Sequence, residues 1–205
     1  MPEHVAVDEA VDVLLRRAEE ARVGSRRVVL LIDGRSGSGK TTLGRAVAAA
    51  WPDDRLGPAR LVHLDDVYPG WYGLEAASRA LETSILSPVA PGWQRWDWEH
   101  DRAGAWEVLD PAVSLIVEGA GAVTRASSSL ADVRVWLELD ADTRRRRALD
   151  RDGAAFEPWW DVWAAQEDRH LARSSPRELA DVVVSAGWSP TSEHAPGSEQ
   201  VAQDG

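Results

Sequence analysis

The feature that most constrains this chain is a glycine-rich segment that directly follows an apolar run. Residues 28–32 form a continuous apolar run with β-branched side chains, which predicts a strand buried on both faces. The next residues fit G-x-x-x-x-G-K-[ST] at every fixed position and lead into a helix-forming segment at about 40–51. Glycines let backbone N–H groups converge on phosphate oxygens, and a helix N-terminus favours negative charge. The residues expected to hold a nucleoside triphosphate are Gly34, Arg35, Ser36, Gly37, Ser38, Gly39, Lys40, Thr41 and Thr42.

Two side chains of this loop have separate chemical roles. Lys40 is placed to reach the β- and γ-phosphates, and the Thr41 hydroxyl is placed to ligate Mg²⁺. Lys40 is also the only lysine among the 23 basic residues. A GTPase needs another lysine in its guanine-reading N-K-x-D segment, so that class is excluded. The chain is short for a motor ATPase, which leaves a small-molecule kinase with ATP and Mg²⁺ as the leading class.

Further apolar runs alternate with helix-forming segments, which indicates an α/β fold. We expect a P-loop NTPase fold, with a five-stranded parallel sheet flanked by helices, in one kinase domain over residues 1–186. A small helical lid is expected at about 141–156, and the Ser-, Pro- and Gln-containing residues 187–205 predict a disordered tail. The other expected strands lie near 61–64, 113–117, 133–137 and 181–184, and the other expected helices near 5–22, 74–86, 141–152 and 157–173.

Acidic residues stand at the ends of two expected strands. Asp65 and Asp66 follow the strand at 61–64, and Glu118 ends the strand at 113–117. Ligands of parallel sheets bind beyond the carboxyl ends of the strands. Asp65 is therefore the expected general base for an acceptor hydroxyl, and Glu118 is an expected Mg²⁺ ligand. A helix cap or a turn is the alternative role for the aspartate pair, and a turn is the alternative role for Glu118.

Arg144, Arg147 and Arg151 are spaced three and four residues apart, so they share one face of the expected lid helix. Guanidiniums that converge on a transferring phosphoryl group stabilise its negative charge. These arginines therefore join Asp65 and Lys40 as predicted catalytic residues. A solvated face paired with neighbouring aspartates is the alternative.

Several of the 11 tryptophans lie in a Gly/Pro-rich stretch, where a flat ligand can stack. Trp71 and Trp96 belong to this group, and packing is the alternative for most of its members. Asp97, between two tryptophans, is the residue there best suited to bind a ligand hydroxyl. His170 is expected to be structural.

Composition and net charge exclude some classes of binding partner and of chemistry. The net charge of -11 argues against a nucleic-acid polymer or an anionic membrane as partner. No apolar run reaches the roughly 18 residues of a membrane span, and the acidic N-terminus is unlike a secretory signal. With no cysteine, disulfides and cysteine nucleophiles are excluded. We expect a cytoplasmic enzyme with a small-molecule hydroxyl acceptor, and a homo-oligomer stays open.

Five segments in order resemble the uridine kinase-like branch of P-loop nucleoside kinases, whose relatives include phosphoribulokinase and a bacterial pantothenate kinase. They are GRSGSGKTT, LDDVY, RWDWE, LIVEG and DADTRRRRALDRD, which span roughly residues 28–185. The resemblance implies that Asp65 activates the acceptor hydroxyl, that Asp97 binds ribose hydroxyls and that Glu118 lies near the metal. It also implies that Arg144 opens the lid helix. With Tyr68 of the D-x-F-Y pattern, the expected substrate-binding residues are Asp65, Asp66, Tyr68, Trp71, Trp96, Asp97 and Arg144.

The chain departs from this family pattern at two places. Asp66 and Val67 replace the usual Ser and Phe, so Asp66 competes with Asp65 for the role of base. Trp98-Glu99 stands where uridine kinases commonly have His-Pro, so residues that read the nucleobase cannot be carried over. The predicted reaction is phosphoryl transfer from ATP to a hydroxyl, foremost the 5′-hydroxyl of a pyrimidine nucleoside. The alternatives are another hydroxyl acceptor (a sugar, a pantothenate-like compound or an antibiotic) and a non-catalytic ATP-binding regulatory protein.

Overall fold

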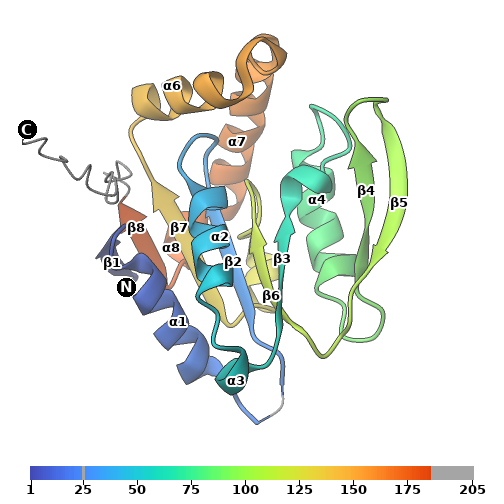
Figure 1. Ribbon diagram of the computed structural model, residues 1–205. Coiled ribbons are helices and arrows are strands. Elements are labelled where there is room, and N and C mark those ends of the chain that lie inside the picture. The colour runs from blue at the N-terminus through green and yellow to red at the C-terminus, as the bar shows by residue number, and fades with distance from the viewer. Residues whose placement is uncertain (25, 186–205) are drawn as a thin grey trace, which may run out of the picture.

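The computed structural model describes residues 1–24 and 26–185, and it confirms the α/β fold with a parallel sheet. Every strand of the main sheet runs parallel to its neighbours, in the order β1-β8-β7-β2-β6-β3 (Figure 1). The sheet thus has six strands, and the expected number of five was wrong. Its strands are β1 (Glu3–Ala6), β2 (Val29–Gly34), β3 (Ala59–His63), β6 (Ser114–Glu118), β7 (Val133–Glu138) and β8 (Val182–Ser185).

The additional strand is β1, which occupies the start of the segment expected to be a helix over 5–22. Helix α1 (Ala10–Ala21) begins only at Ala10, and β1 pairs with β8 through Val5 and Val184. An edge strand of four residues is too short to establish a period of two in the sequence. β1 is held as a strand by its pairing with β8, almost 180 residues away, and not by a local sequence pattern.

Helices cover both faces of the sheet (Figure 1). Leu30 and Ile32 of β2 belong to one core cluster with residues of α1 and α2, whereas Val29 and Leu31 belong to the cluster that includes α4 and α7. The apolar run is therefore buried on both faces, as predicted. The remaining helices are α2 (Lys40–Ala49), α3 (Asp53–Leu56), α4 (Leu74–Ala80), α5 (Arg125–Ser128), α6 (Ala141–Asp152), α7 (Trp160–Ser174) and α8 (Pro176–Leu179).

Short π-helical and 3-10 turns extend or connect some of the helices and strands. A π-helical turn, η2 (Leu81–Ile85), continues α4, so the segment expected as one helix at 74–86 has two parts. The 3-10 turns η3 (Gly153–Ala155) and η4 (Glu157–Trp159) connect α6 to α7, and η1 (Leu64–Asp66) follows β3. In Figure 1, α6 lies above the loop between β2 and α2, in the position of the expected lid.

The tryptophan-rich stretch forms an antiparallel hairpin of β4 (Gly92–Asp97) and β5 (Arg102–Val108), which was not predicted. The hairpin forms a separate two-stranded sheet beside α4 (Figure 1). Trp93 is buried in the core, whereas Trp106 is exposed. Packing is therefore the role of Trp93, in line with the alternative given for this group.

Two further predictions concern the C-terminal tail and membrane-spanning helices. The tail predicted at 187–205 lies outside the described residues. In the part of the chain that the structure describes, each helix is too short or too polar to cross a membrane.

Candidate active site

The glycine-rich loop joins β2 to α2 at the carboxyl edge of the sheet. Helix α2 begins at Lys40, and its N-cap Gly39 has a φ of 104°. The Lys40 side chain is largely buried, and its Nζ donates to the carbonyl oxygen of Arg35 at 3.2 Å. The ammonium and the N-terminus of α2 therefore lie at one place, as a triphosphate site requires.

A pocket of about 440 Å³ lies beside this loop and brings together ten of the predicted site residues. They come from the glycine-rich loop and the start of α2, from the segment that follows β3, from the end of β6 and from α6. The ten are Ser36, Gly37, Lys40, Thr41, Thr42, Asp65, Tyr68, Trp71, Glu118 and Arg151. Five further lining residues were not predicted, namely Arg45, Trp98, Ala120, Phe156 and Trp163.

Glu118 is buried at the end of β6, only 2% exposed, and is the centre of a small polar cluster. Its Oε1 accepts a hydrogen bond from the Thr41 hydroxyl at 3.1 Å and lies 2.5 Å from Nδ1 of His63. The hydrogen bond to Glu118 raises the pKa of His63 against the opposing effect of burial. His63 pairs in register with Glu118 across β3 and β6, a signal that appears only once the strands are known to be neighbours.

The Thr41–Glu118 pair fits a Mg²⁺ ion chemically. Mg²⁺ prefers oxygen ligands, and in kinases it is typically bound by one or two protein side chains together with substrate phosphates. Thr41 and Glu118 offer a hydroxyl and a carboxylate beside the loop. Within the described residues, no group of three or more acidic, His or Cys side chains forms a metal site by itself.

Asp65 lies in η1, directly after β3, and lines the same pocket. The side chain is open to solvent through the pocket, but protein surrounds it closely. This partial desolvation, followed by the charge of Glu118, raises the pKa of Asp65, while Lys40 and Arg151 oppose the rise. A carboxylate between a buried acid and two cations is suited to accept a proton from a hydroxyl.

Asp66, the rival for this role, does not line the pocket. Its Oδ1 lies 3.8 Å from Nη2 of Arg95 on the hairpin. Consecutive residues of a 3-10 turn point in different directions, so only one of the two aspartates can face the loop. The geometry therefore favours Asp65 as the base.

Aromatic side chains form the wall of the pocket away from the loop. The Trp71 ring stacks on Phe156 at a centroid distance of 5.5 Å and contacts Trp98 at 4.9 Å. Trp98 also donates from Nε1 to the carbonyl oxygen of Asp65 at 2.8 Å. This wall joins the loop after β3, the hairpin and the segment after α6.

Tyr68 reaches the pocket with its ring, but its hydroxyl is already engaged. The hydroxyl donates to the carbonyl oxygen of Ala120 at 2.9 Å, and the ring meets Trp163 edge to face. Burial raises the pKa of Tyr68 well above its ordinary value. Tyr68 is thus brought to the predicted site as an apolar surface.

The structure does not bring Trp96 and Asp97 into the pocket. Asp97 Oδ2 lies 2.9 Å from Nδ1 of His100 and 3.5 Å from Nε of Arg102, within the hairpin. Trp96 has a buried indole nitrogen with no hydrogen-bond partner in the described residues. The hairpin bends between Gln94 and Trp96, where the strand register shifts, so the spacing in sequence does not reveal which residue faces the site.

The lid arginines have different positions. Arg151 lines the pocket, whereas neither Arg144 nor Arg147 does. Arg144 is buried against the phosphate loop, where its Nη1 donates to the carbonyl oxygen of Ser36 at 3.2 Å. Arg144 therefore joins the lid helix to the loop.

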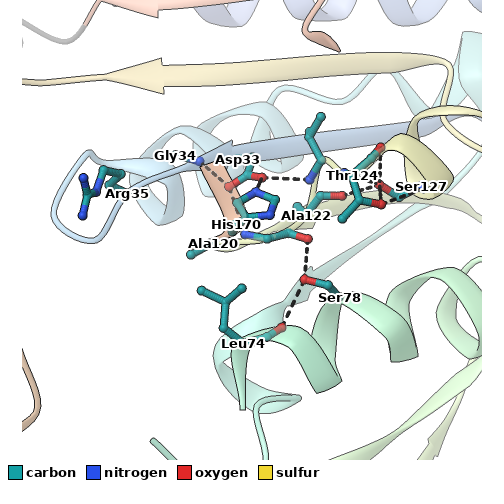
Figure 2. A network of polar contacts seen from close by, with 12 residues as sticks. Asp33, Gly34, Arg35, Leu74, Ser78, Ala120, Ala122, Thr124, Ser127 and His170 are labelled. Atoms are coloured by element: carbon teal, nitrogen blue, oxygen red, sulfur yellow. Dashed lines mark hydrogen bonds and ion pairs between the residues drawn. The ribbon is translucent and has the colours of Figure 1, made fainter. Parts of the chain in front are cut away.

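A buried polar network behind the loop was missed from the sequence. Figure 2 shows the Asp33 carboxylate between His170 of α7 and the backbone at the start of the loop. Asp33 accepts from the Gly34 amide at 2.7 Å and from the Gly121 amide at 3.0 Å, and its Oδ2 lies 2.9 Å from Nε2 of His170. His170 therefore has a structural partner, as expected. Asp33 directly follows the apolar run at 28–32 in sequence, and only the fold brings it to α7.

Comparisons with known proteins point to one group of kinases. No family model matches the chain. A cytidylate kinase from Methanococcoides burtonii is 26% identical over 130 residues, which are 63% of this chain and 66% of that protein. A uridine kinase from Alkaliphilus metalliredigens is 25% identical over 153 residues, 62% of this chain and 69% of that protein. The chain thus spans about two thirds of the length of these curated relatives.

A solved structure of a possible uridine kinase from Bacillus stearothermophilus has a similar fold over most of this chain. Its TM-score is 0.59 at 22% identity, over 87% of this chain and 98% of that chain. At this identity the likeness concerns the fold. In fold and in sequence, the expected resemblance of this chain to the uridine kinase-like P-loop kinases is confirmed.

Proposed function

We propose that the chain is an ATP-dependent kinase that transfers the γ-phosphate to a hydroxyl of a small molecule, foremost the 5′-hydroxyl of a pyrimidine nucleoside. The observation that carries the proposal is one pocket that holds both the phosphate loop and the Asp65 carboxylate. An acceptor between them has a phosphate donor on one side and a base on the other. The similar uridine kinase and cytidylate kinase support the reaction class.

The chemistry divides among the residues of the pocket. The loop amides and Lys40 would bind the triphosphate, and Thr41 and Glu118 would hold Mg²⁺, which would neutralise phosphate charge. Asp65 orients the acceptor hydroxyl and takes its proton as the bond from the γ-phosphorus to the acceptor oxygen forms and the bond to the β–γ bridging oxygen breaks, which releases ADP. Arg151 stabilises the negative charge on the transferring group. The aromatic wall excludes water, which competes as an acceptor.

The lining of the pocket favours a neutral acceptor over a nucleotide. The segment 65–71 after β3, the hairpin and the segment from η3 to α7 contribute only Asp65 and aromatic side chains, among the residues described. The cationic lining residues come from α2 and α6. An acceptor that already carries a phosphate needs its own arginine or lysine contacts, so a nucleoside fits better than a nucleoside monophosphate.

A panel of acceptors tests this proposal. Uridine, cytidine, their 5′-monophosphates and non-nucleoside alcohols are each incubated with ATP and Mg²⁺, and initial rates give kcat/KM. We expect a nucleoside to have the highest kcat/KM. A higher value for a monophosphate would assign the chain to nucleotide phosphorylation, and a higher value for a sugar or another alcohol would assign it to that acceptor. ATP binding without transfer to any acceptor would favour a regulatory protein.

Cytoplasmic location and assembly also belong to the proposal. A kinase that uses ATP is expected where ATP is made, and the cytoplasm meets this need. A homo-oligomer stays a prediction, which the mass of the protein in solution tests.

A further inference from the structure

Glu167 of α7 binds the phosphate loop (residues 34–41) from outside the pocket. Its side chain is only 3% exposed. Oε1 accepts a hydrogen bond from the backbone amide of Ser36 at 2.6 Å, and Oε2 accepts from Nε of Arg35 at 2.9 Å. One buried carboxylate thus fixes both the backbone and a side chain of the loop, across 131 residues of sequence.

The neighbouring residues of α7 distinguish this contact from a surface ion pair. Asp168, the next residue, also pairs with Arg35 at 2.9 Å, but its side chain is 64% exposed and makes no contact with the loop backbone in the described structure. His170, almost one turn on, holds Asp33, whose Oδ1 accepts from the Gly34 amide. The first residues of the loop are therefore fixed from α7 by buried groups at two points.

We propose that Glu167 is a positioning residue for the phosphate loop. It holds the segment Arg35–Ser36 in place, so that the following amides and Lys40 face the triphosphate before the nucleotide arrives. A short loop that is ordered in advance loses less conformational entropy on binding. The effect on nucleotide binding rests on the proposed function, whereas the effect on loop order does not.

Hydrogen–deuterium exchange of the ligand-free protein tests the ordering directly. We expect Glu167→Ala to accelerate amide exchange in the loop peptide about 10- to 100-fold, the range for losing hydrogen bonds to a charged group. Glu167→Gln keeps an acceptor for the Ser36 amide and should give an intermediate value. Asp168→Asn removes the exposed partner of Arg35 and should leave exchange unchanged. Unchanged exchange in Glu167→Ala, or an equal change in Asp168→Asn, overturns the proposal.

The Kd and KM for ATP give a second readout, because a residue that only stabilises the fold would leave both unchanged. Glu167→Ala should raise the Kd and KM for ATP by about tenfold or more with a smaller change in kcat, and Glu167→Gln should recover part of the loss. A lower melting temperature with unaltered loop exchange and KM overturns the positioning role. If the wild-type protein binds no ATP, the proposed function fails, and the exchange experiment alone still decides the role of Glu167.

Discussion

Asp65 is the single residue on which the proposed chemistry depends most. It lies in the pocket with Lys40 and Arg151 and receives a hydrogen bond from Trp98 at its carbonyl oxygen. Desolvation raises the pKa of its carboxyl, which makes it a stronger base than an aspartate in water. The adjacent Asp66 points toward the hairpin and provides a matched control.

Asp65→Asn should therefore retain ATP binding and lose about 10²- to 10⁴-fold in kcat, the usual contribution of a general base. Asp66→Asn should keep kcat within a few-fold of the wild type, because Asp66 does not line the pocket. Steady-state kinetics with titrated ATP binding measure both variants. An active Asp65→Asn beside an inactive Asp66→Asn would exchange their roles.

The sequence revealed some of these residues and not others, for a physical reason. Lys40 lies in a motif whose chemistry is local, and Asp65 follows a strand end, so both could be predicted. His63, Trp98 and Glu167 gain their roles only from neighbours distant in sequence. A single sequence without the strand order does not reveal such neighbours.

Helix α6 packs directly on the phosphate loop at Gly37, where there is no side chain between them. Gly37 has a φ of 78°, and a Cβ added there would lie 2.1 Å from the carbonyl oxygen of Arg144. The first turn of α6 and the loop thus have no room for a side chain between them. A side chain at position 37 would therefore have to displace α6 or the loop.

Gly37→Ala should displace α6 and weaken ATP binding by about tenfold or more, because backbone strain of about 1–2 kcal/mol adds to the clash. Gly24→Ala is the matched control, since Gly24 has a φ of 58° and nothing lies near its Cβ position. Binding titrations with thermal unfolding separate the two effects. Equal ATP affinity in the two variants would mean that the contact between lid and loop has no role in binding.

Helix α7 also contributes His170, which makes a buried polar contact with Asp33 of β2. Burial alone lowers the pKa of His170, but the hydrogen bond and charge of Asp33, together with Glu167, outweigh it and the repulsion from Arg173, so the pKa is raised. A raised pKa in the folded state means that the charged histidine stabilises the fold. This contribution is complete below about pH 6.5, the ordinary histidine value, and is lost as the pH rises through the folded-state pKa.

His170→Gln leaves a neutral donor for Asp33 and removes the titration. The wild type should exceed this variant in free energy of unfolding near pH 6 by about 1.5–3 kcal/mol, the range for a charge-assisted hydrogen bond, and the difference should shrink toward pH 9. Urea unfolding across this pH range measures it. A difference that is constant or widens with pH contradicts the assignment.

At the scale of the whole molecule, the parallel sheet followed from strands and helices that alternate along the chain. Two parts did not follow from it. β1 is a four-residue edge strand without a visible period, and the hairpin β4–β5 carries Gly and Trp where an alternating apolar pattern would signal strands. The hairpin brings Trp98 to the pocket, so a part of the fold that was not predicted also contributes to the aromatic wall of the pocket.

The proposed activity is phosphoryl transfer from ATP to a neutral hydroxyl, which the presence of the phosphate loop and Asp65 in one pocket supports. The direct measurement is ³¹P NMR of the wild-type protein with ATP, Mg²⁺ and an equimolar mixture of uridine and uridine 5′-monophosphate. The account predicts that a nucleoside 5′-monophosphate signal grows in step with ADP. A falling monophosphate signal with new uridine diphosphate, or ATP and monophosphate signals that both stay constant, would contradict it.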